Sequence, residues 1–376
     1  MTDADILIVG GGPAGLALAL SLAGTGHRTV VADARGRDAV AADPRALALA
    51  HGSRLTLERL GVWRDLPATA IDTIHVSQRG GFGRTVLRAA ELDVPALGHV
   101  VPAGALAAAL RRAVDAAGIP VRDDTPVADL AAESGLVRAT LGGQPFTARL
   151  VVRAEGGPGE GDGVRTRDYG QHALIAEVTP RDGHGHTAFE RFTPEGPLAL
   201  LPSGTGYAGV LVVSGETADR LAALDDAAFL DHLQRTIGHR VALAAVGART
   251  RYPLALRYRP SAAGPRTVWL GNAAQTLHPV AGQGFNLALR DVFALATTLR
   301  DATDPGDAAV LADWARGRRL DRAGTIGFTD ALIRIFANDC APLSAARGLG
   351  LAALDLCAPL RGFVARRMMY GARAWP

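Results

Sequence analysis

The N-terminal part of the chain alternates between short apolar runs and longer segments with helical periodicity. Residues 6–9 (ILIV) form an apolar run that is typical of a buried strand. Residues 16–22 then repeat apolar side chains at helical spacing, and Gly24 and Gly26 end that segment. Residues 29–31 (TVV) predict a second strand. This order predicts a strand–helix–strand unit at the start of the chain.

The rest of the chain also divides into helix-like and strand-like segments. Helices are predicted at residues 45–63, 101–117 and 218–237, and over most of the chain beyond residue 287. Strands are predicted at residues 73–77, 85–87, 173–178, 187–192, 198–201, 207–213 and 267–270, with several more between 121 and 150. The runs from 173 to 213 are separated by Pro and Gly turns, as in an antiparallel sheet. The predicted fold class is therefore α/β with an added antiparallel sheet (α+β).

A glycine-rich turn follows the first predicted strand. Gly10, Gly12 and Gly15 give the pattern G-x-G-x-x-G, and Asp33 follows the second strand at the spacing of an acid that binds a ribose hydroxyl. The glycines admit a pyrophosphate, whose charge the helix start binds. The pattern in this context predicts a Rossmann-like dinucleotide site. The alternative is a tight turn between strand and helix that binds no ligand.

A second glycine-rich loop lies near residue 280. Residues 271–291 read GNAAQTLHPVAGQGFNLALRD, a loop with Gly282 and Gly284 that opens directly into a predicted helix. A helix N-terminus carries unpaired N–H groups and a partial positive charge, and glycine lets a ligand approach the backbone closely. This segment therefore predicts a site for a planar or anionic ligand.

The order of the segments predicts domains that are discontinuous in sequence. We expect residues 1–70, 98–166 and 265–300 to form the cofactor domain. Residues 71–97 and 167–264 would form a substrate domain around the antiparallel sheet, and residues 301–376 a C-terminal helical region. The cleft between the first two domains is the expected substrate site.

Composition narrows the function further. The net charge of +3 over 376 residues comes with no concentrated basic stripe, which argues against nucleic-acid binding. All 40 basic residues are arginines, so chemistry that needs a lysine is impossible. The sequence has no long apolar span and no signal-peptide pattern, so we expect a cytoplasmic protein. Cys340 and Cys357 lack metal-ligand spacing and are expected to be buried free thiols, and no metal site is predicted.

Several of these segments together resemble one enzyme family. The segments are GGGPAG with Asp33, Arg45 before a predicted helix, Asp168-Tyr-Gly-Gln171, Ala188-Phe-Glu-Arg-Phe-Thr-Pro194, the 271–291 loop, and a tail around 322–338. Over nearly the whole chain they resemble the flavin-dependent aromatic hydroxylases of ubiquinone biosynthesis. Asn272 and Gln275, where sister enzymes usually carry Asp and His, favour the branch that hydroxylates a polyprenyl methoxyphenol.

The resemblance implies FAD as the cofactor and assigns its contacts. FAD would lie along the first glycine turn with its adenosine ribose on Asp33, while Arg45 would reach the flavin or its phosphates. Asn272 would lie near the ribityl and pyrophosphate groups. The residues implied for cofactor binding are Gly10, Gly12, Ala14, Gly15, Asp33, Arg45, Asn272, Pro279, Gly282, Gly284 and Asn286.

The resemblance also implies the reaction. NADPH or NADH would reduce FAD, O₂ would form a C4a-hydroperoxyflavin, and the phenol would take up one oxygen atom. The resemblance assigns no catalytic base. Two other functions remain open: hydroxylation of a small soluble phenol or polyketide, and a flavin-binding assembly component with little turnover. The second of these functions is suggested by Glu155-Gly156, which replaces the usual Asp-Gly, and by the absence of the Ser that usually follows. Arg165 or Arg167 would take over the contacts that this segment makes in the family.

Some residues near these motifs have simpler structural interpretations. His278 is expected to pack or to hydrogen-bond rather than to act as a base, and Asp291 to lie on a helix surface or to cap the helix. The tail at 341–376 combines apolar residues with arginines. It predicts an amphipathic helix packed on the cofactor domain. The alternative is a surface that meets the inner membrane or a lipid-carrying partner, including a quinone-biosynthesis complex.

Overall fold

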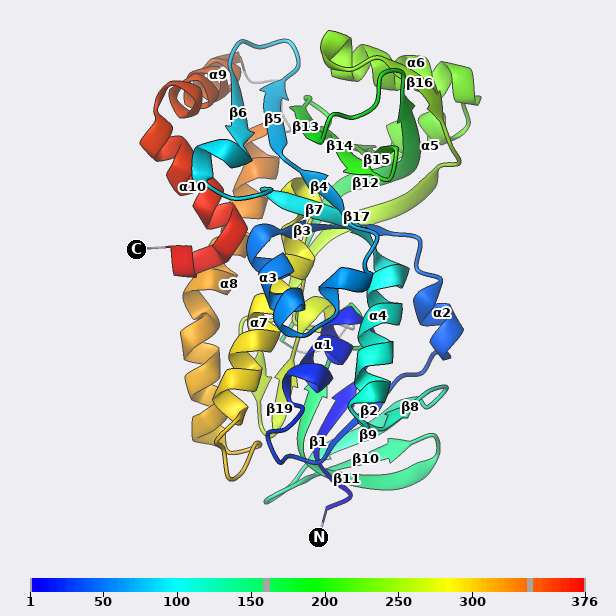
Figure 1. Cartoon of the computed structure of the whole chain (residues 1–376), viewed down its shortest axis with the longest axis vertical. Coiled ribbons are helices and arrows are strands. Elements are labelled where there is room, and N and C mark those ends of the chain that lie inside the picture. The colour runs from blue at the N-terminus through cyan, green and yellow to red at the C-terminus, as the bar shows by residue number, and fades with distance from the viewer. Residues whose placement is uncertain (1, 158–162, 337–340, 375–376) are drawn as a thin grey trace.

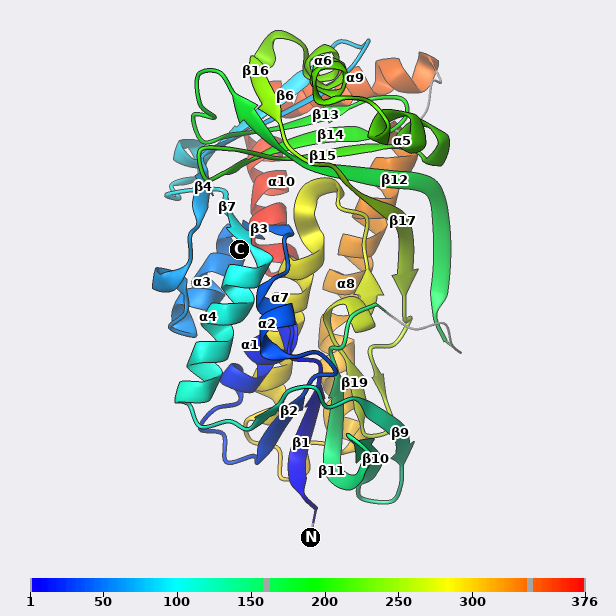
Figure 2. The ribbon, with the colours of Figure 1, turned by 90° about the vertical axis from the view of Figure 1, so that its right-hand side faces the viewer.

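The computed structural model describes residues 2–157, 163–336 and 341–374. Two large sheets lie at opposite ends of an elongated molecule, and α7 (Gln283–Leu299) and α8 (Ala308–Phe336) run along its length between them (Figures 1 and 2). Both glycine-rich segments lie between the two sheets. The sequence therefore predicts the α/β class and the antiparallel sheet correctly.

The first sheet carries the N-terminal strand–helix–strand unit. Its main path runs β18-β19-β11-β1-β2-β8, and the pairs from β19 to β8 are parallel, while β9 and β10 extend it antiparallel from β11. Three separate stretches of the chain supply its strands. They are β1 (Ala4–Val9), β2 (Thr29–Ala32), β8 (Val121–Arg122), β9 (Val127–Ala132), β10 (Val137–Leu141), β11 (Gln144–Arg153), β18 (Ala263–Gly264) and β19 (Thr267–Trp269).

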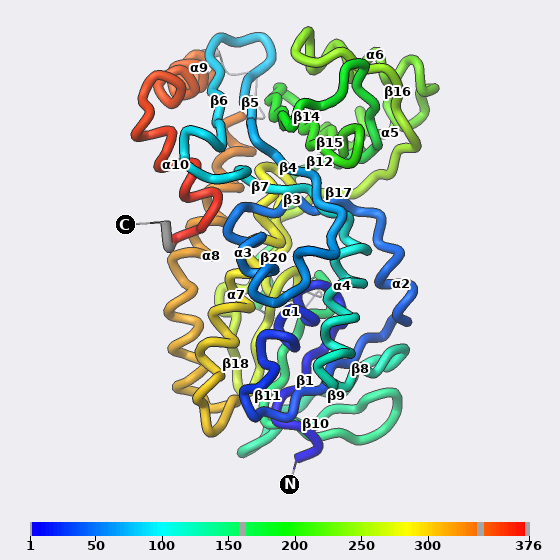
Figure 3. Tube along the Cα trace, viewed as in Figure 1, coloured from blue at the N-terminus to red at the C-terminus, as the bar shows by residue number. Residues whose placement is uncertain are grey.

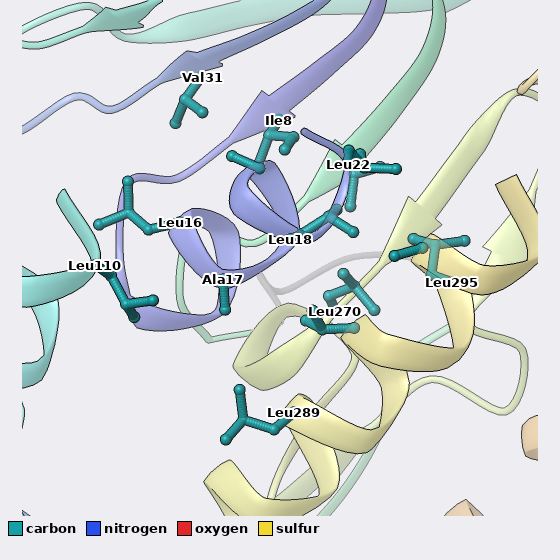
Figure 4. Close-up of a cluster of buried hydrophobic side chains, with 14 of the residues drawn as sticks. Ile8, Leu16, Ala17, Leu18, Leu22, Val31, Leu110, Leu270, Leu289 and Leu295 are labelled. Atoms are coloured by element: carbon teal, nitrogen blue, oxygen red, sulfur yellow. The ribbon is translucent and has the colours of Figure 1, made fainter. Parts of the chain in front are cut away.

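The largest hydrophobic core covers one face of this sheet. Helix α1 (Pro13–Ser21) packs between α4 (Ala103–Ala116) and α7, so the consecutive residues from Leu16 to Ala19 are all buried (Figure 4). Leu18 on α1 is fully buried. Truncating a leucine in such a position to alanine costs about 2–5 kcal/mol, which shows how strongly this packing fixes α1 and the turn before it.

The second sheet is mostly antiparallel and follows the order β20-β17-β12-β15-β14-β13-β5-β6, with β16 paired to β12. Among the described strands of this sheet, one pair, β5 and β13, is parallel, because β5 arrives from a distant part of the chain rather than through a hairpin. The strands are β5 (Thr73–Gln78), β6 (Arg84–Arg88), β12 (Arg165–Pro180), β13 (Thr187–Phe192), β14 (Pro197–Ser203), β15 (Gly206–Ser214), β16 (Leu243–Val246), β17 (Thr250–Tyr258) and β20 (Gln275–Thr276).

The helix predicted at 45–63 is wrong in its first part. Residues there form β3 (Ala46–Ala50), and α3 (His51–Arg59) begins only afterwards. β3 pairs antiparallel with β7 (Gly98–Pro102), which also pairs with β4 (Thr69–Ile71) in a small third sheet. The run ALALA has high helix propensity, but pairing with β7 overrides that local preference.

The helix predicted at 218–237 is in fact two helices. α5 (Gly215–Ala222) and α6 (Asp226–Ile237) each begin at their own N-cap, Ser214 and Asp225, whose side chains accept a backbone N–H from the first turn. Both helices lie on the outer side of the second sheet (Figure 2). The remaining short helix, α2 (Arg37–Ala41), follows β2.

The C-terminal segment folds back along the molecule. α9 (Ala341–Leu356) packs on β6, and α10 (Ala358–Tyr370) returns beside α3 (Figure 3). The thiol of Cys357, between the two helices, is exposed, so the prediction of a buried thiol is wrong there; Cys340 lies outside the described residues. In the described part of the chain, no single helix is both long and apolar enough to cross a membrane. α9 and α10 reach that length and composition only as a pair, and the pair is bent by 98°.

Candidate functional site

The first glycine turn connects β1 to α1 and is held from both sides. Gly10 has a φ of +110°, and a Cβ there would lie 2.5 Å from the carbonyl oxygen of Ala154. A Cβ at Gly15 would overlap the carbonyl oxygen of Gly10. These two glycines are therefore required by the close packing of strand and helix.

Gly12 has a different environment. A Cβ at this position would meet only the Arg35 guanidinium, at 4.0 Å, so the space beside Gly12 is open. Gly12 is also the N-cap of α1, and no side chain caps the helix there. The start of α1 therefore offers its N–H groups to an anionic ligand.

Asp33 lies at the end of β2, beside this turn. Its Oδ2 accepts the backbone N–H of Gly11 (2.6 Å), and its Oδ1 accepts the backbone N–H of Arg35 (2.8 Å). Burial alone would raise the pKa of Asp33, but the hydrogen bonds from Arg35 and Gly11 outweigh burial and lower the pKa. Asp33 therefore carries its charge in the wall of a cavity of about 230 Å³, whose lining also includes Arg111 and Asp123.

The second glycine loop packs directly on the first turn. A Cβ at Gly271 would lie 3.4 Å from the Cβ of Ala14, so the two segments meet although they are far apart in sequence. Asn272 follows and is exposed. Pro279 is exposed as well, Gly282 has a φ of +58° beside Ala48, and Gly284 faces open space. The segments that sequence reasoning assigned to one site are thus brought together.

Asn286 has a different position from the one predicted. Its Oδ1 accepts the backbone N–H of Ala50 (2.7 Å) and the hydroxyl of Ser53 (2.7 Å). Its Nδ2 donates to the carbonyls of Ala48 (2.8 Å) and Gly282 (2.7 Å). The amide is 1% exposed and fully engaged, so Asn286 ties β3 to the start of α7.

Arg45 does not open a helix, because β3 follows it. Its guanidinium forms an ion pair with Asp43, which stands two residues earlier in the chain. The pKa of Arg45 is raised, chiefly by its hydrogen bonds to that carboxylate. The contacts with Asp43 use Nε and Nη2 of Arg45, which leaves Nη1 as the donor that could reach a phosphate.

Glu155 and Gly156 lie beside the first glycine turn, where the sequence departs from the family pattern. A Cβ at Gly10 would lie 2.7 Å from the Cα of Glu155, whose carboxylate pairs with Arg153. Residues 158–162 lie outside the described structure. Arg167, one of the predicted substitutes, forms an ion pair with Asp330 of α8 (2.6 Å).

His278 is buried beside the loop and serves as a packing residue, as predicted. Its Nδ1 accepts the backbone N–H of Val280 (3.1 Å), and its ring packs edge-on against Tyr169. Burial lowers the pKa of His278 to about 4. The neutral imidazole is therefore the stable form at neutral pH.

A buried network of charges lies behind the loop, and sequence reasoning missed it. Asp291 is 1% exposed, which corrects its predicted place on the helix surface. It accepts from Arg318 (2.6 Å) and from the side chain of Gln275 (3.2 Å), whose Oε1 in turn accepts from Arg322 (3.0 Å). Arg318 also pairs with Asp321 (2.6 Å). The i, i+3 and i+4 spacing of charges on α8 is the one sequence signal for this network.

A larger apolar cavity extends from the loop toward the second sheet. Its volume is about 350 Å³, and residues 279–282 form one end of it. β5, β6, β13, β14 and β15 supply one wall, and α8, α9 and α10 supply the other. This cavity can hold a large apolar molecule with one end against the glycine loop.

Comparisons with known proteins agree with this geometry. A model of the family described as an FAD binding domain matches residues 3–326. The chain is 34% identical to the ubiquinone hydroxylase UbiL of Rhodospirillum rubrum, over 97% of this chain and 89% of that protein. It is 32% identical to the 3-demethoxyubiquinol 3-hydroxylase of Escherichia coli, over 95% and 96% of the two proteins. The solved structure of p-nitrophenol 4-monooxygenase PnpA from Pseudomonas putida DLL-E4 shares the fold, with a TM-score of 0.78 at 16% identity over 98% of each chain.

Proposed function

The chain belongs to the FAD binding domain family of flavoprotein monooxygenases, and we propose that it hydroxylates the ring of a polyprenyl (methoxy)phenol in ubiquinone biosynthesis. The single observation that carries the proposal is the apolar cavity of about 350 Å³ that ends on the second glycine loop. A prenylated ring fits such a cavity because its lining is almost entirely apolar. The same arrangement would leave the ring beside a flavin held on that loop.

The residues present fit FAD. Open space beside Gly12 and Gly284 would let the pyrophosphate and the flavin approach the backbone, and the contact of Ala14 with Gly271 joins the two halves of the site. Asp33 is charged and forms an ion pair with Arg35. Its carboxylate would accept a hydrogen bond from a ribose hydroxyl and would then bind both that hydroxyl and the Arg35 side chain. Pro279 and Gly282 would line the flavin ring, and Asn286 would hold the loop from behind.

Bound FAD, with O₂ and electrons from NADPH or NADH, would supply the transferable oxygen atom. The chain itself would bind the phenol, orient its ring toward the loop and exclude water through the apolar walls. The positive end of the α7 dipole would favour negative charge on the reduced flavin.

We also propose a peripheral contact between the C-terminal helices and a membrane surface. Leu349 and Leu356 on α9 and Leu360 on α10 are exposed, and α9 and α10 also line the apolar cavity. Arg366 is exposed on the same segment and would pair with anionic lipid. Cosedimentation with anionic vesicles, lost when Leu349 and Leu356 are both changed to Ser, would support this contact; equal recovery of the variant would contradict it.

The simplest test of the proposed function is the absorbance spectrum of the purified protein. We expect a flavin spectrum, either as purified or after FAD is added, and a protein that takes up no flavin would contradict the proposal. Deletion of the gene should then cause the under-hydroxylated polyprenyl phenol to accumulate. NAD(P)H oxidation coupled to product with short phenols alone would instead favour hydroxylation of a small soluble substrate.

A further inference from the structure

One row of residues crosses the second sheet beneath the apolar cavity. The strand registers place Thr85, Val76, Glu190, Ala199 and Val210 side by side on β6, β5, β13, β14 and β15. All five line the cavity. Side chains in such a row point to the same face of a sheet, so Glu190 is directed into the cavity between two small apolar neighbours.

The carboxylate of Glu190 is left without a hydrogen-bond donor. Its Oε1 is buried, and no donor among the described residues reaches that atom. This arrangement is unusual, because buried polar groups are nearly always paired. The hydroxyl of Thr85 in the same row is also buried and unpaired. With strands about 4.8 Å apart, the two polar groups lie roughly 10 Å from each other across the row.

No charged group in the described part of the chain neutralises Glu190. The neighbouring strands contribute apolar residues and Thr85 to the lining, and α8, α9 and the 279–282 loop contribute only apolar ones. Arg361 on α10 is the other charged residue of the lining, and its guanidinium pairs with Glu91 (3.0 Å). Arg191, next on β13, donates to the carbonyl of Thr236 (2.7 Å) and to Ser77. Burial raises the pKa of Glu190 to about 7.

We propose that Glu190 binds the phenolic hydroxyl of the substrate and is the base that takes its proton. The proposal rests on the proposed function, and its basis is the unpaired carboxylate in the cavity that ends at the second glycine loop. A phenol O–H is the donor that Oε1 lacks, and an aromatic ring fits the apolar walls on either side of it.

The proton transfer makes the ring a better nucleophile. The phenol O–H bond breaks, its proton moves to Oε1 of Glu190, and the freed electron pair increases electron density at the ring carbons ortho and para to the oxygen. One of these carbons then bonds to one oxygen atom of O₂ and afterwards loses its hydrogen as a proton. The other oxygen atom leaves as water, with two electrons supplied by the reduced nicotinamide. A base near neutral pKa suits this role because it is charged at the working pH yet still basic.

The first test measures binding without turnover. The oxidised FAD-loaded enzyme is titrated by calorimetry with 2-farnesyl-6-methoxyphenol and with its O-methyl ether, at about pH 8 and about pH 6, on either side of the pKa of Glu190. At the higher pH the wild type should prefer the phenol by roughly tenfold, because a hydrogen bond to a carboxylate is charge-assisted. The preference should shrink at the lower pH. In the Glu190→Gln variant the preference for the phenol over its ether should be smaller than in the wild type at the higher pH, and it should have the same value at both pH values.

The second test measures the reaction. Glu190→Gln should lower kcat/KM at about pH 8 by about 100-fold and remove the rise in rate with pH, since general bases contribute factors of this size. The ratio of wild-type to variant rate should decrease with more acidic phenols, which need less help from a base. Glu177→Gln, an exposed change on the same sheet, should leave both measurements as in the wild type.

The outcomes separate this role from the function on which it rests. A wild-type preference for the phenol that does not change with pH, or a Glu190→Gln enzyme that hydroxylates phenols at the wild-type rate, would overturn the role of Glu190 and leave the proposed function intact. A flavin-loaded wild type that neither binds nor hydroxylates any phenol would overturn both.

Discussion

The side chain of Asn286 accepts the backbone N–H of Ala50 at 2.7 Å and so joins the first turn of α7 to the end of β3. The same amide donates to the carbonyl of Gly282, where the second glycine loop ends. One residue therefore fixes the loop, the helix and the strand relative to one another.

Replacing Asn286 should destabilise the protein. Asn286→Ala would remove hydrogen bonds from the partly buried N–H of Ala50 and from the partly buried carbonyls of Ala48 and Gly282, so the free energy of unfolding should fall by about 2–4 kcal/mol. Urea denaturation would measure this change in the free energy of unfolding. Thr297→Ala, an exposed change on the same helix, should alter that free energy by less than about 0.5 kcal/mol. A loss for Asn286→Ala no larger than the control's would show that other contacts hold the loop.

Asp33 should determine FAD affinity. Asp33→Asn keeps the shape but removes the charge that would accept from the ribose, so the Kd for FAD should rise about 10- to 100-fold. Quenching of flavin fluorescence on binding would measure the Kd. Asp38→Asn changes an exposed carboxylate in the lining of the same cavity and serves as the control. Equal Kd values for both variants would argue against a ribose contact at Asp33.

The buried histidine beside the loop should make stability depend on pH. The pKa of His278 falls from 6.5 to about 4 on folding because the ring is buried, so the unfolded chain binds a proton more readily than the folded protein. The contribution of His278 to the free energy of unfolding is complete above pH 6.5 and is lost as the pH falls toward 4, a difference of about 3 kcal/mol. His278→Asn keeps an acceptor for Val280 but cannot titrate in this range. Unfolding free energies across this range should fall less steeply for the variant, and parallel curves would contradict the prediction.

The charge network behind the loop should be sensitive to the loss of one partner. Burial alone would raise the pKa of Asp321, but Arg290 and Arg318 outweigh it and lower the pKa. Asp321→Asn would leave buried guanidinium charge unbalanced and should reduce the free energy of unfolding by about 3–5 kcal/mol. The difference should be complete above about pH 4 and shrink below it, because the unfolded wild-type chain then binds a proton at Asp321 that the folded protein, with its lowered pKa, still resists.

The exposed pair of Asp313 and Arg316 on the same helix provides the control. Asp313→Asn should change the free energy of unfolding by less than about 1 kcal/mol. Thermal or urea denaturation of the two variants side by side would decide whether burial, rather than charge pairing as such, makes the network important.

The sequence was most informative where the chain determines its own conformation. Gly15 is required because its backbone meets the carbonyl of Gly10 only five residues earlier, so the local glycine pattern was enough to predict the turn. β3 was mistaken for a helix because its strand conformation depends on β7, about fifty residues away. The role of Asn286 depends on Ala50, far away in the sequence. Glu190 was part of a family-like motif, but its unpaired position in the cavity becomes visible only when five strands are aligned.

The distance in sequence between the two glycine segments has a consequence for biosynthesis. The turn at Gly12 leaves the ribosome early, whereas Gly284 follows about 270 residues later, an interval of roughly 13–50 s at ordinary elongation rates. During that time β1, β2 and α1 lack β19 and α7, which complete their core. The nascent chain therefore exposes apolar surface until the last third has emerged. Cofactor loading and completion of the core become nearly simultaneous, late events, and the unfinished chain is the form that most needs a chaperone.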